Sequence, residues 1–144
     1  MAYDGKFSPK NPSKYLGDPT KVFYRSLWER RVMVHLDESP SVIAWSSEEI
    51  IIPYLSPVDN RWHRYFPDFF VKVTNKQGVA ESMILEVKPK NQSKPPVKKS
   101  KITRRYINEV MTWGVNEAKW KAATEYCKDR QWAFKVITEE HLGL

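Results

Sequence analysis

Two acidic residues and one lysine stand in neighbouring strand-like segments, where together they could hydrolyse a phosphodiester bond. Asp68 follows Pro67, and Glu86 and Lys88 are two residues apart in an otherwise apolar run. Because side chains alternate between the faces of a strand, Glu86 and Lys88 should point the same way as Ile84. Charged groups inside an apolar strand cost stability unless they are paired or bind something. The pattern therefore indicates an ion pair or a functional site.

The two carboxylates suit a divalent cation, and the lysine suits an attacking water molecule. Two carboxylates that lie close together repel each other unless a proton or a cation lies between them. Mg²⁺ prefers oxygen ligands, lowers the pKa of a bound water and neutralises charge that develops on a phosphate. A neighbouring lysine can orient or deprotonate that water, or stabilise the transition state. Asp68, Glu86 and Lys88 are thus a minimal set for metal-assisted phosphodiester hydrolysis.

The alternative is structural. Glu86 and Lys88 could form an ordinary ion pair on a solvated strand face, with Asp68 as a turn or edge carboxylate. Short strings of an acid, any residue and a lysine occur by chance in most proteins, so these three residues alone favour the ion pair. The apolar flanks, the Pro-Asp pair and a basic segment directly downstream shift the balance toward a functional site.

The chain length and composition predict one globular domain. The 144 residues, of which 41% are hydrophobic, can bury a single core, so we expect one domain over residues 1–144. The single cysteine, Cys127, excludes an intramolecular disulfide and disfavours a cysteine-built zinc site. No signal-peptide-like or membrane-length apolar stretch is present. We therefore expect a soluble cytoplasmic protein with no membrane partner.

The net charge of +7 favours a polyanionic partner, and the positive charge is concentrated in one segment. No acidic residue lies between Glu86 and Glu109. Lysines there would supply sequence-independent affinity for DNA phosphates, although a solvated flexible loop is the alternative for any one of them. The predicted DNA-binding residues are Lys90, Lys94, Lys98, Lys99, Lys101, Arg104 and Arg105.

Proline, glycine and hydrophobic periodicity predict the elements that position these residues. Residues 1–22 should form an extended N-terminal arm, either pinned to the body by Phe7 and Tyr15 or used in assembly. Ser26 and Glu29 fit a capping box at the start of a helix. The helix should end near residue 37, and strands are expected at 42–45, 50–54, 62–73 and 81–88.

The 62–73 strand would place Phe66, Asp68 and Phe70 on one face and His63 on the other. Residues 89–101, which include Pro95 and Pro96, should form a mobile basic loop. A helical region over about 103–129 would follow, with Gly114 as a point where it could kink. The last elements expected are a strand at 132–137 and a short helix capped at Thr138.

The same strings resemble a known family. Pro67-Asp68 with Glu86-Val87-Lys88 resembles the PD-(D/E)xK motif of the restriction-endonuclease-like superfamily. Arg25 to Glu29 resembles the first-helix glutamate motif of TnsA-type transposon-end nucleases and archaeal junction resolvases. Strings along nearly the whole chain are similar to the head-completion nucleases of contractile-tailed bacteriophages: Asn11–Tyr15, Tyr24–Ser26, Trp45–Glu49, Pro53-Tyr54, His63–Phe69 and Asn116–Trp120.

The resemblance implies an α/β fold with a restriction-endonuclease-like core, in which helices flank a central mixed sheet of four or five strands. It implies that Asp68, Glu86, the carbonyl of Val87 and Glu29 hold Mg²⁺, for which Mn²⁺ can substitute. Lys88 would be the catalytic lysine. From spacing alone Glu29 fits a helix cap better than a catalytic group, and one side chain cannot easily serve both roles in the same rotamer.

The function implied is a Mg²⁺-dependent DNA endonuclease of phage head completion, acting after DNA packaging and before tail joining. It would act in the host cytoplasm, with phage head or portal-neck proteins as partners; retention in the virion and homodimer formation stay open. The alternatives are a structural head–neck virion protein with a vestigial site, and a transposon-end or junction-resolving nuclease. The intact acidic trio opposes the first alternative, and the whole-chain resemblance opposes the second.

Other side chains are accessory candidates. A structural or DNA-contacting role for His63 is favoured over a general base. Asn116 breaks an apolar helical stripe about one turn from Lys119, and either could face the site, although a satisfied core polar residue is the alternative for Asn116. Glu48 and Glu49 could add a metal ligand, but a solvated hairpin edge is favoured.

Overall fold

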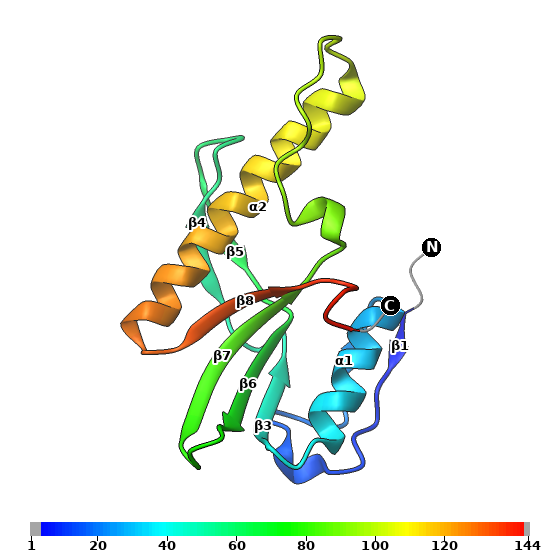
Figure 1. Ribbon diagram of the computed structural model, residues 1–144, viewed down its shortest axis with the longest axis vertical. Coiled ribbons are helices and arrows are strands. Elements are labelled where there is room, and N and C mark those ends of the chain that lie inside the picture. The colour runs from blue at the N-terminus through cyan, green and yellow to red at the C-terminus, as the bar shows by residue number, and fades with distance from the viewer. Residues whose placement is uncertain (1–3, 143–144) are drawn as a thin grey trace.

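The centre of the molecule is a mixed four-stranded sheet, seen in a computed structural model that describes residues 4–142 (Figure 1). The strand order is β3-β6-β7-β8. β3 (Val42–Ser47), β6 (Phe69–Thr74) and β7 (Ala80–Val87) pair antiparallel, and β8 (Ala133–Ile137) is parallel to β7. The predicted α/β fold with a central mixed sheet is therefore confirmed, and it is consistent with a restriction-endonuclease-like core.

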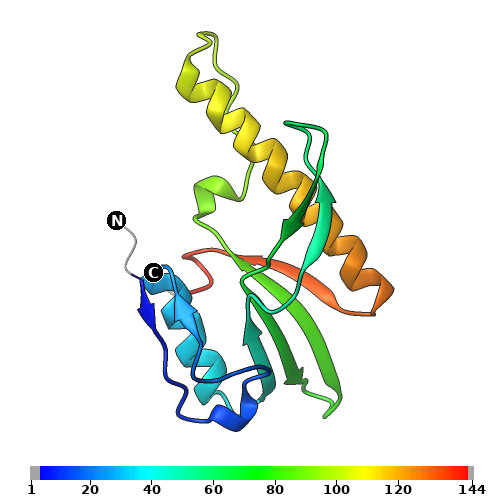
Figure 2. The ribbon, with the colours of Figure 1, turned by 180° about the vertical axis from the view of Figure 1, so that it is seen from behind.

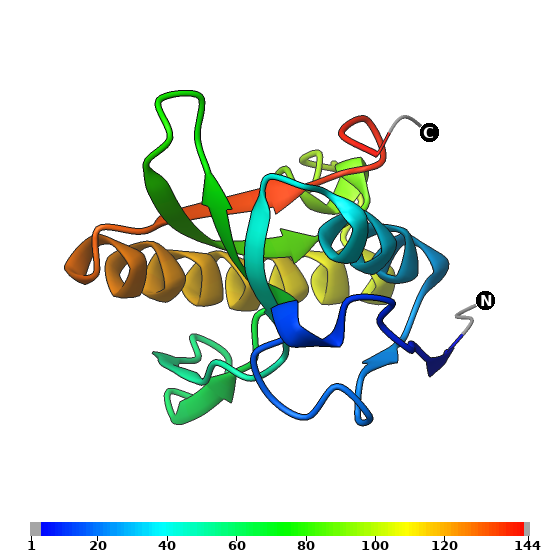
Figure 3. The same cartoon turned by 90° about the horizontal axis from the view of Figure 1, so that it is seen from below.

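Two helices cover the two faces of this sheet (Figure 3). α1 (Leu27–Glu38) packs on the face that carries Leu85, and α2 (Arg104–Asp129) packs on the face that carries Ile84. The two core clusters are separate because neighbouring residues of β7 point to opposite faces. The first contains Val32, Met33 and Leu36 of α1, and the second contains Ala123 and Cys127 of α2.

The antiparallel register brings the acidic residues to one end of the sheet. Phe69 pairs with Leu85, so Asp68, just before β6, lies next to Glu86, near the end of β7. Ser47 at the end of β3 also pairs with Phe69. Three chain segments therefore meet at this end of the sheet, and the predicted hairpin that carries Asp68 and Glu86 is confirmed.

The expected continuous strand over residues 62–73 is wrong. β4 (Ile52–Leu55) and β5 (Trp62–Tyr65) form a separate two-stranded hairpin beside α2 (Figure 2), and the chain enters the main sheet only at Phe69. Pro67 lies in the break, where it has no N–H to donate to a strand ladder. The expectation that His63 and Asp68 lie on opposite faces of one strand therefore no longer applies.

The N-terminal arm is extended, but it carries short regular elements. β1 (Gly5–Lys6) pairs with β2 (Phe23–Tyr24), and the 3₁₀ helix η1 (Pro12–Lys14) lies between them. The first three residues of the predicted arm lie outside the described residues. The pairing means that the arm folds back on itself instead of running free.

Two aromatic side chains fasten the arm to the sheet, as predicted. Phe7 and Tyr15 are both buried. Their rings meet the fully buried Trp45 of β3 edge-on, with ring centroids 5.9 Å and 4.8 Å away. Edge-on contacts of this kind add to the stabilisation from burial.

The segment that follows β7 is mostly irregular, as expected for residues 89–101, except for the 3₁₀ helix η2 (Lys90–Gln92). α2 then runs without interruption through Gly114, so this glycine does not divide the helix. The expected terminal helix is wrong within the described residues: residues 139–142 form turns, and the Thr138 amide donates to His141 Nδ1 at 3.0 Å. No helix within residues 4–142 has the length and apolar character needed to cross a membrane.

Candidate active site

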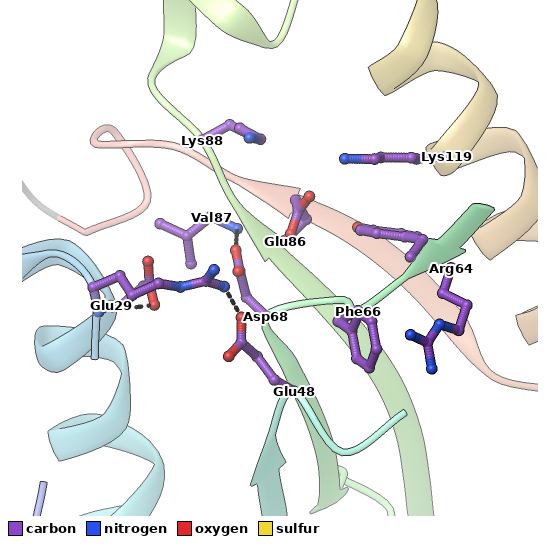
Figure 4. A pocket seen from close by; sticks show the side chains of 11 residues that line it. Glu29, Glu48, Arg64, Phe66, Asp68, Glu86, Val87, Lys88 and Lys119 are labelled. Carbon is purple, nitrogen blue, oxygen red and sulfur yellow. Dashed lines mark hydrogen bonds and ion pairs between the residues drawn. The ribbon is translucent and has the colours of Figure 1, made fainter. Parts of the chain in front are cut away.

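A polar pocket of about 500 Å³ opens at the end of the sheet where β6 starts and β7 finishes (Figure 4). Its walls come from α1 and the residues just before it, from β5, β7 and α2, and from the segments that follow β3, β5 and β7. The structure thus brings together the four predicted catalytic residues, Glu29, Asp68, Glu86 and Lys88, with Val87. The lining residues are Arg25, Glu29, Glu48, Arg64, Tyr65, Phe66, Asp68, Glu86, Val87, Lys88 and Lys119.

Asp68 and Glu86 form the acidic centre of the pocket. Glu86 is buried, and Asp68 Oδ2 accepts a hydrogen bond of 2.7 Å from the Val87 amide. Removal from water and the negative charge of Glu86 raise the pKa of Asp68 well above its usual range, and Glu29 adds to this effect. The Val87 hydrogen bond offsets only part of the rise. Two carboxylates in this state favour a proton or a cation between them.

Tyr65 lies beside this pair and was not singled out from the sequence. Its hydroxyl is buried and makes no hydrogen bond of normal geometry to any described residue. Burial and the charge of Glu86 raise the pKa of Tyr65, so the phenol keeps its proton. A buried hydroxyl without a partner costs about 1–3 kcal/mol. The O–H is therefore an available donor toward Glu86 or toward a group bound there.

Glu29 reaches the pocket because of its place on α1. It shares a helix face with Val32, Met33 and Leu36, which pack against the sheet at three- and four-residue spacing. The predicted capping interaction is also present, since the Glu29 amide donates to Ser26 Oγ at 3.1 Å. The Glu29 carboxylate accepts from the Arg25 amide at 3.4 Å, one residue earlier than expected for a capping box. In this rotamer the carboxylate serves the helix cap.

Two lysines face Glu86 from opposite sides (Figure 4). Lys88 follows β7, and its amide donates to the Ile137 carbonyl at 2.9 Å, which fixes the backbone beside the site. Lys119 comes from α2, with its Nζ 5.6 Å from the centre of the Tyr65 ring. Removal from water lowers the pKa of Lys119; Lys88 lowers it further, while Glu86 opposes the change. The two ammonium groups could bind one phosphate.

The donor atoms fit a divalent ion such as Mg²⁺ or Mn²⁺. Within residues 4–142, no three histidine, cysteine, aspartate or glutamate side chains converge as a complete ligand group. Asp68 and Glu86 nevertheless offer only oxygen, and Val87, whose carbonyl was the expected third ligand, lines the same pocket. Glu29 could join them by leaving its cap rotamer. Mg²⁺ usually keeps several waters, so an incomplete protein ligand set suits it.

Glu48 lines the pocket and does not lie on the solvated hairpin edge that was expected. It follows β3 with a positive φ of 55°, which is uncommon for a residue other than glycine or asparagine. Its amide donates to the Asp68 carbonyl at 3.2 Å, and its carboxylate pairs with Arg25. Glu49, in contrast, accepts from the Tyr15 hydroxyl and does not line the pocket. No sequence signal indicated the backbone conformation of Glu48.

Of the accessory candidates His63, Asn116 and Lys119, the first two do not line the pocket. The His63 ring bonds the Asp59 carboxylate at 2.7 Å and stacks on Tyr54. Asn116 is only 6% exposed and does not line the pocket, so it belongs to the core polar residues. Lys119 alone of the three faces Glu86.

The basic segment runs from the end of β7 to the projecting end of α2 (Figure 2). Two of its members already have acidic partners: Lys90 Nζ bonds Glu140 at 2.6 Å, and Arg105 pairs with Glu109 at 3.3 Å. The Lys90 amide also donates to the carboxylate of Glu139. The other members are exposed: Lys94, Lys98, Lys99, Lys101 and Arg104.

Two comparisons with known proteins find nucleases among the proteins to which this chain is similar. Residues 39–139 match the family described as "TnsA-like endonuclease N terminal". The chain is also 43% identical to the head completion nuclease of Enterobacteria phage T4 over 146 residues, which cover 99% of this chain and 95% of that protein. The family match begins after α1 and therefore omits Glu29, whereas the alignment with the phage protein spans the whole pocket.

Proposed function

The chain belongs to the family of TnsA-like endonucleases and head completion nucleases, and from this premise we propose that it is a metal-dependent endonuclease that cuts DNA as a phage head is completed. The observation that carries the proposal is the convergence of Glu29, Asp68, Glu86 and Lys88 on one pocket. The relationship supports action in the host cytoplasm after DNA packaging and before tail joining. Head or portal-neck proteins of the phage would be its assembly partners.

Asp68, Glu86 and the Val87 carbonyl would hold the metal, and Glu29 would complete the ligand set. A bound Mg²⁺ or Mn²⁺ would lower the pKa of a water molecule and neutralise charge on the phosphate. The Tyr65 O–H would hold the Glu86 carboxylate in place. The raised pKa of Asp68 supports a cation at this site, because burial and the charge of Glu86 disfavour ionisation of both carboxyls. Metal binding is thus expected to displace a proton from the pair.

The basic side chains would act on the DNA phosphate itself. Lys88 is placed to orient the attacking water or to stabilise the developing charge. Lys119 faces the same carboxylate from α2 and would bind a non-bridging oxygen. Arg25, now paired with Glu48, could exchange that carboxylate for a DNA phosphate, because both partners are partly exposed.

The direct test is to incubate the pure protein with linear, nicked, branched and single-stranded DNA. We expect cleavage with Mg²⁺ or Mn²⁺ and none with a chelator, read out on denaturing gels. A parallel preparation of Asp68→Ala detects contaminating nucleases. If the wild type cuts none of these DNAs with either metal, the nuclease proposal is wrong and a structural role at the head–neck junction is favoured.

Removing four exposed lysines of the basic segment should weaken DNA binding and its salt dependence. Lys94, Lys98, Lys99 and Lys101 have no acidic partner among the described residues. Each phosphate contact contributes about 0.9 to the slope of log affinity against log salt on duplex DNA. Replacing all four with glutamine should flatten the slope by up to about 3.6, measured by fluorescence anisotropy.

The matched control removes the same charge elsewhere. Lys21, Lys72, Lys76 and Lys121 are exposed and lie outside the basic segment. Their replacement with glutamine should leave the slope within about one unit of the wild type, because a single contact is worth about 0.9. An equal effect of both quadruple variants would mean that net charge, and not this segment, binds DNA.

A further inference from the structure

The β4–β5 hairpin has one buried face and one exposed face. Tyr54 and Tyr65 on the inner face are buried in the core cluster that contains α2. The register pairs Leu55 with Trp62 and Pro53 with Arg64, and residues that pair directly point to the same side. All four of these residues are exposed. The outer face of the hairpin therefore has no partner among the described residues.

Trp62 and Arg64 share this exposed face, and Phe66 follows directly after β5 and contacts Arg64; these three residues are here called the outer stripe. Trp62 is 70% exposed and Phe66 is 40% exposed. The Arg64 guanidinium carbon lies 5.7 Å from the centre of the Phe66 ring. Arg64 and Phe66 line the catalytic pocket, so the stripe leads from that pocket along β5. Figure 4 shows both side chains at the pocket rim.

The chemistry of the outer stripe suits nucleobases. Aromatic rings and arginine planes are the groups on which proteins stack unpaired bases. Side chains two residues apart on a strand are separated by about 6.7 Å, which is roughly twice the 3.4 Å spacing of stacked bases. A base could thus fit between two neighbouring side chains of the outer stripe. Bases inside a duplex offer their edges, and their faces are already covered.

We propose that the outer stripe binds unpaired bases of DNA, so that the substrate has a single-stranded segment beside the bond that is cut. Its continuity with the pocket and the net charge of +7 favour nucleic acid over a protein as the occupant. The preference for the cut site rests on the nuclease function proposed above. The stacking of bases on Trp62 is independent of that function, because it requires no metal and no cleavage.

The test compares two DNAs of the same sequence, a labelled 12-nucleotide single strand and its duplex, by fluorescence anisotropy without divalent metal. Trp62→Ala should weaken single-strand binding by about 5- to 150-fold and change duplex binding less than about twofold. Phe23→Ala is the control, since Phe23 is a 57% exposed aromatic residue on β2 that does not line the pocket. That variant should bind both DNAs like the wild type.

Two further variants separate stacking from simple apolar contact. Trp62→Tyr should retain most of the single-strand affinity, whereas Trp62→Leu should lose as much as Trp62→Ala, with circular dichroism confirming the fold. An unchanged single-strand affinity of Trp62→Ala overturns the proposal. If sedimentation of that variant also shows altered self-association, the outer stripe is a protein contact instead. A wild type that prefers single strands but cuts no DNA would refute the nuclease and leave the stripe intact.

Discussion

Lys88→Met should reduce metal-dependent DNA cleavage by about 100- to 10,000-fold, the range for loss of a positioned acid–base group. Lys88 faces the Asp68–Glu86 pair in the pocket, and its backbone is held to β8 by the Ile137 carbonyl. Methionine keeps the apolar stem, so the fold should persist while the ammonium group is lost. Single-turnover cleavage at saturating DNA measures the chemical step apart from binding.

The control for this prediction is Lys121→Met. Lys121 is an exposed lysine of α2 that does not line the pocket, and its loss changes the net charge by the same amount. We expect this variant to cut at nearly the wild-type rate, and both variants to bind DNA within a few-fold of the wild type. Wild-type cleavage by Lys88→Met would remove Lys88 from the catalytic step.

Asp68→Asn should have two opposite effects: it should abolish cleavage and stabilise the metal-free protein. The asparagine oxygen can still accept from the Val87 amide, which now donates to Asp68 at 2.7 Å. The change removes a negative charge that lies beside Glu86 and near Glu29. A gain of roughly 1–3 kcal/mol, the usual cost of a poorly satisfied buried polar group, should raise the Tm by several degrees in a chelator.

The pH dependence of this gain follows from the raised pKa of Asp68. The folded protein holds the Asp68 proton more tightly than the unfolded chain, in which the pKa of an aspartate is near 3.8. Metal-free stability should therefore fall as the pH rises from about 3.8 through the raised folded value. Asp68→Asn should lose this component of the fall. Thermal melts of both proteins across pH 4–8 in a chelator would measure this difference. If the Tm of both proteins changed with pH in the same way, the pKa of Asp68 would not be raised in the folded protein.

The centre of the site could be predicted from the sequence because it is a local feature. Asn75 and Gly78 mark the turn between β6 and β7, and Gly78 has the positive φ of 77° that glycine tolerates. The Asn75 side chain accepts from the amides of Gln77 and Val79. Once this turn is fixed, antiparallel pairing places Asp68 beside Glu86.

Residues brought in from a distance could not be placed by pattern alone. The periodicity of α1 shows that Glu29 shares a face with Val32 and Met33, but it does not say which surface that face meets. Only the family resemblance indicated that Glu29 meets Asp68 and Glu86, and all three residues line the pocket. The Glu29 carboxylate bonds the Arg25 amide, so the proposed metal binding would compete with helix capping for it.

The wrong expectation of one continuous strand over residues 62–73 has a clear physical cause. Strand alternation is a local rule, and it cannot detect that the chain leaves one sheet and enters another between Tyr65 and Phe69. Both predicted segments are strands, but the break frees Phe66 and Arg64 to face the pocket. The positive φ of Glu48 is equally invisible in the sequence, because glutamate rarely adopts it.

The most direct test of the central claim is a titration with Mg²⁺, followed by the Tm of the wild type and of Asp68→Asn without DNA. A ligand that binds only the folded state raises its stability by mass action. We predict that the Tm of the wild type rises steadily with Mg²⁺ concentration, while that of Asp68→Asn stays level. An equal rise in both proteins, or none in the wild type, would contradict a metal centre at Asp68 and Glu86.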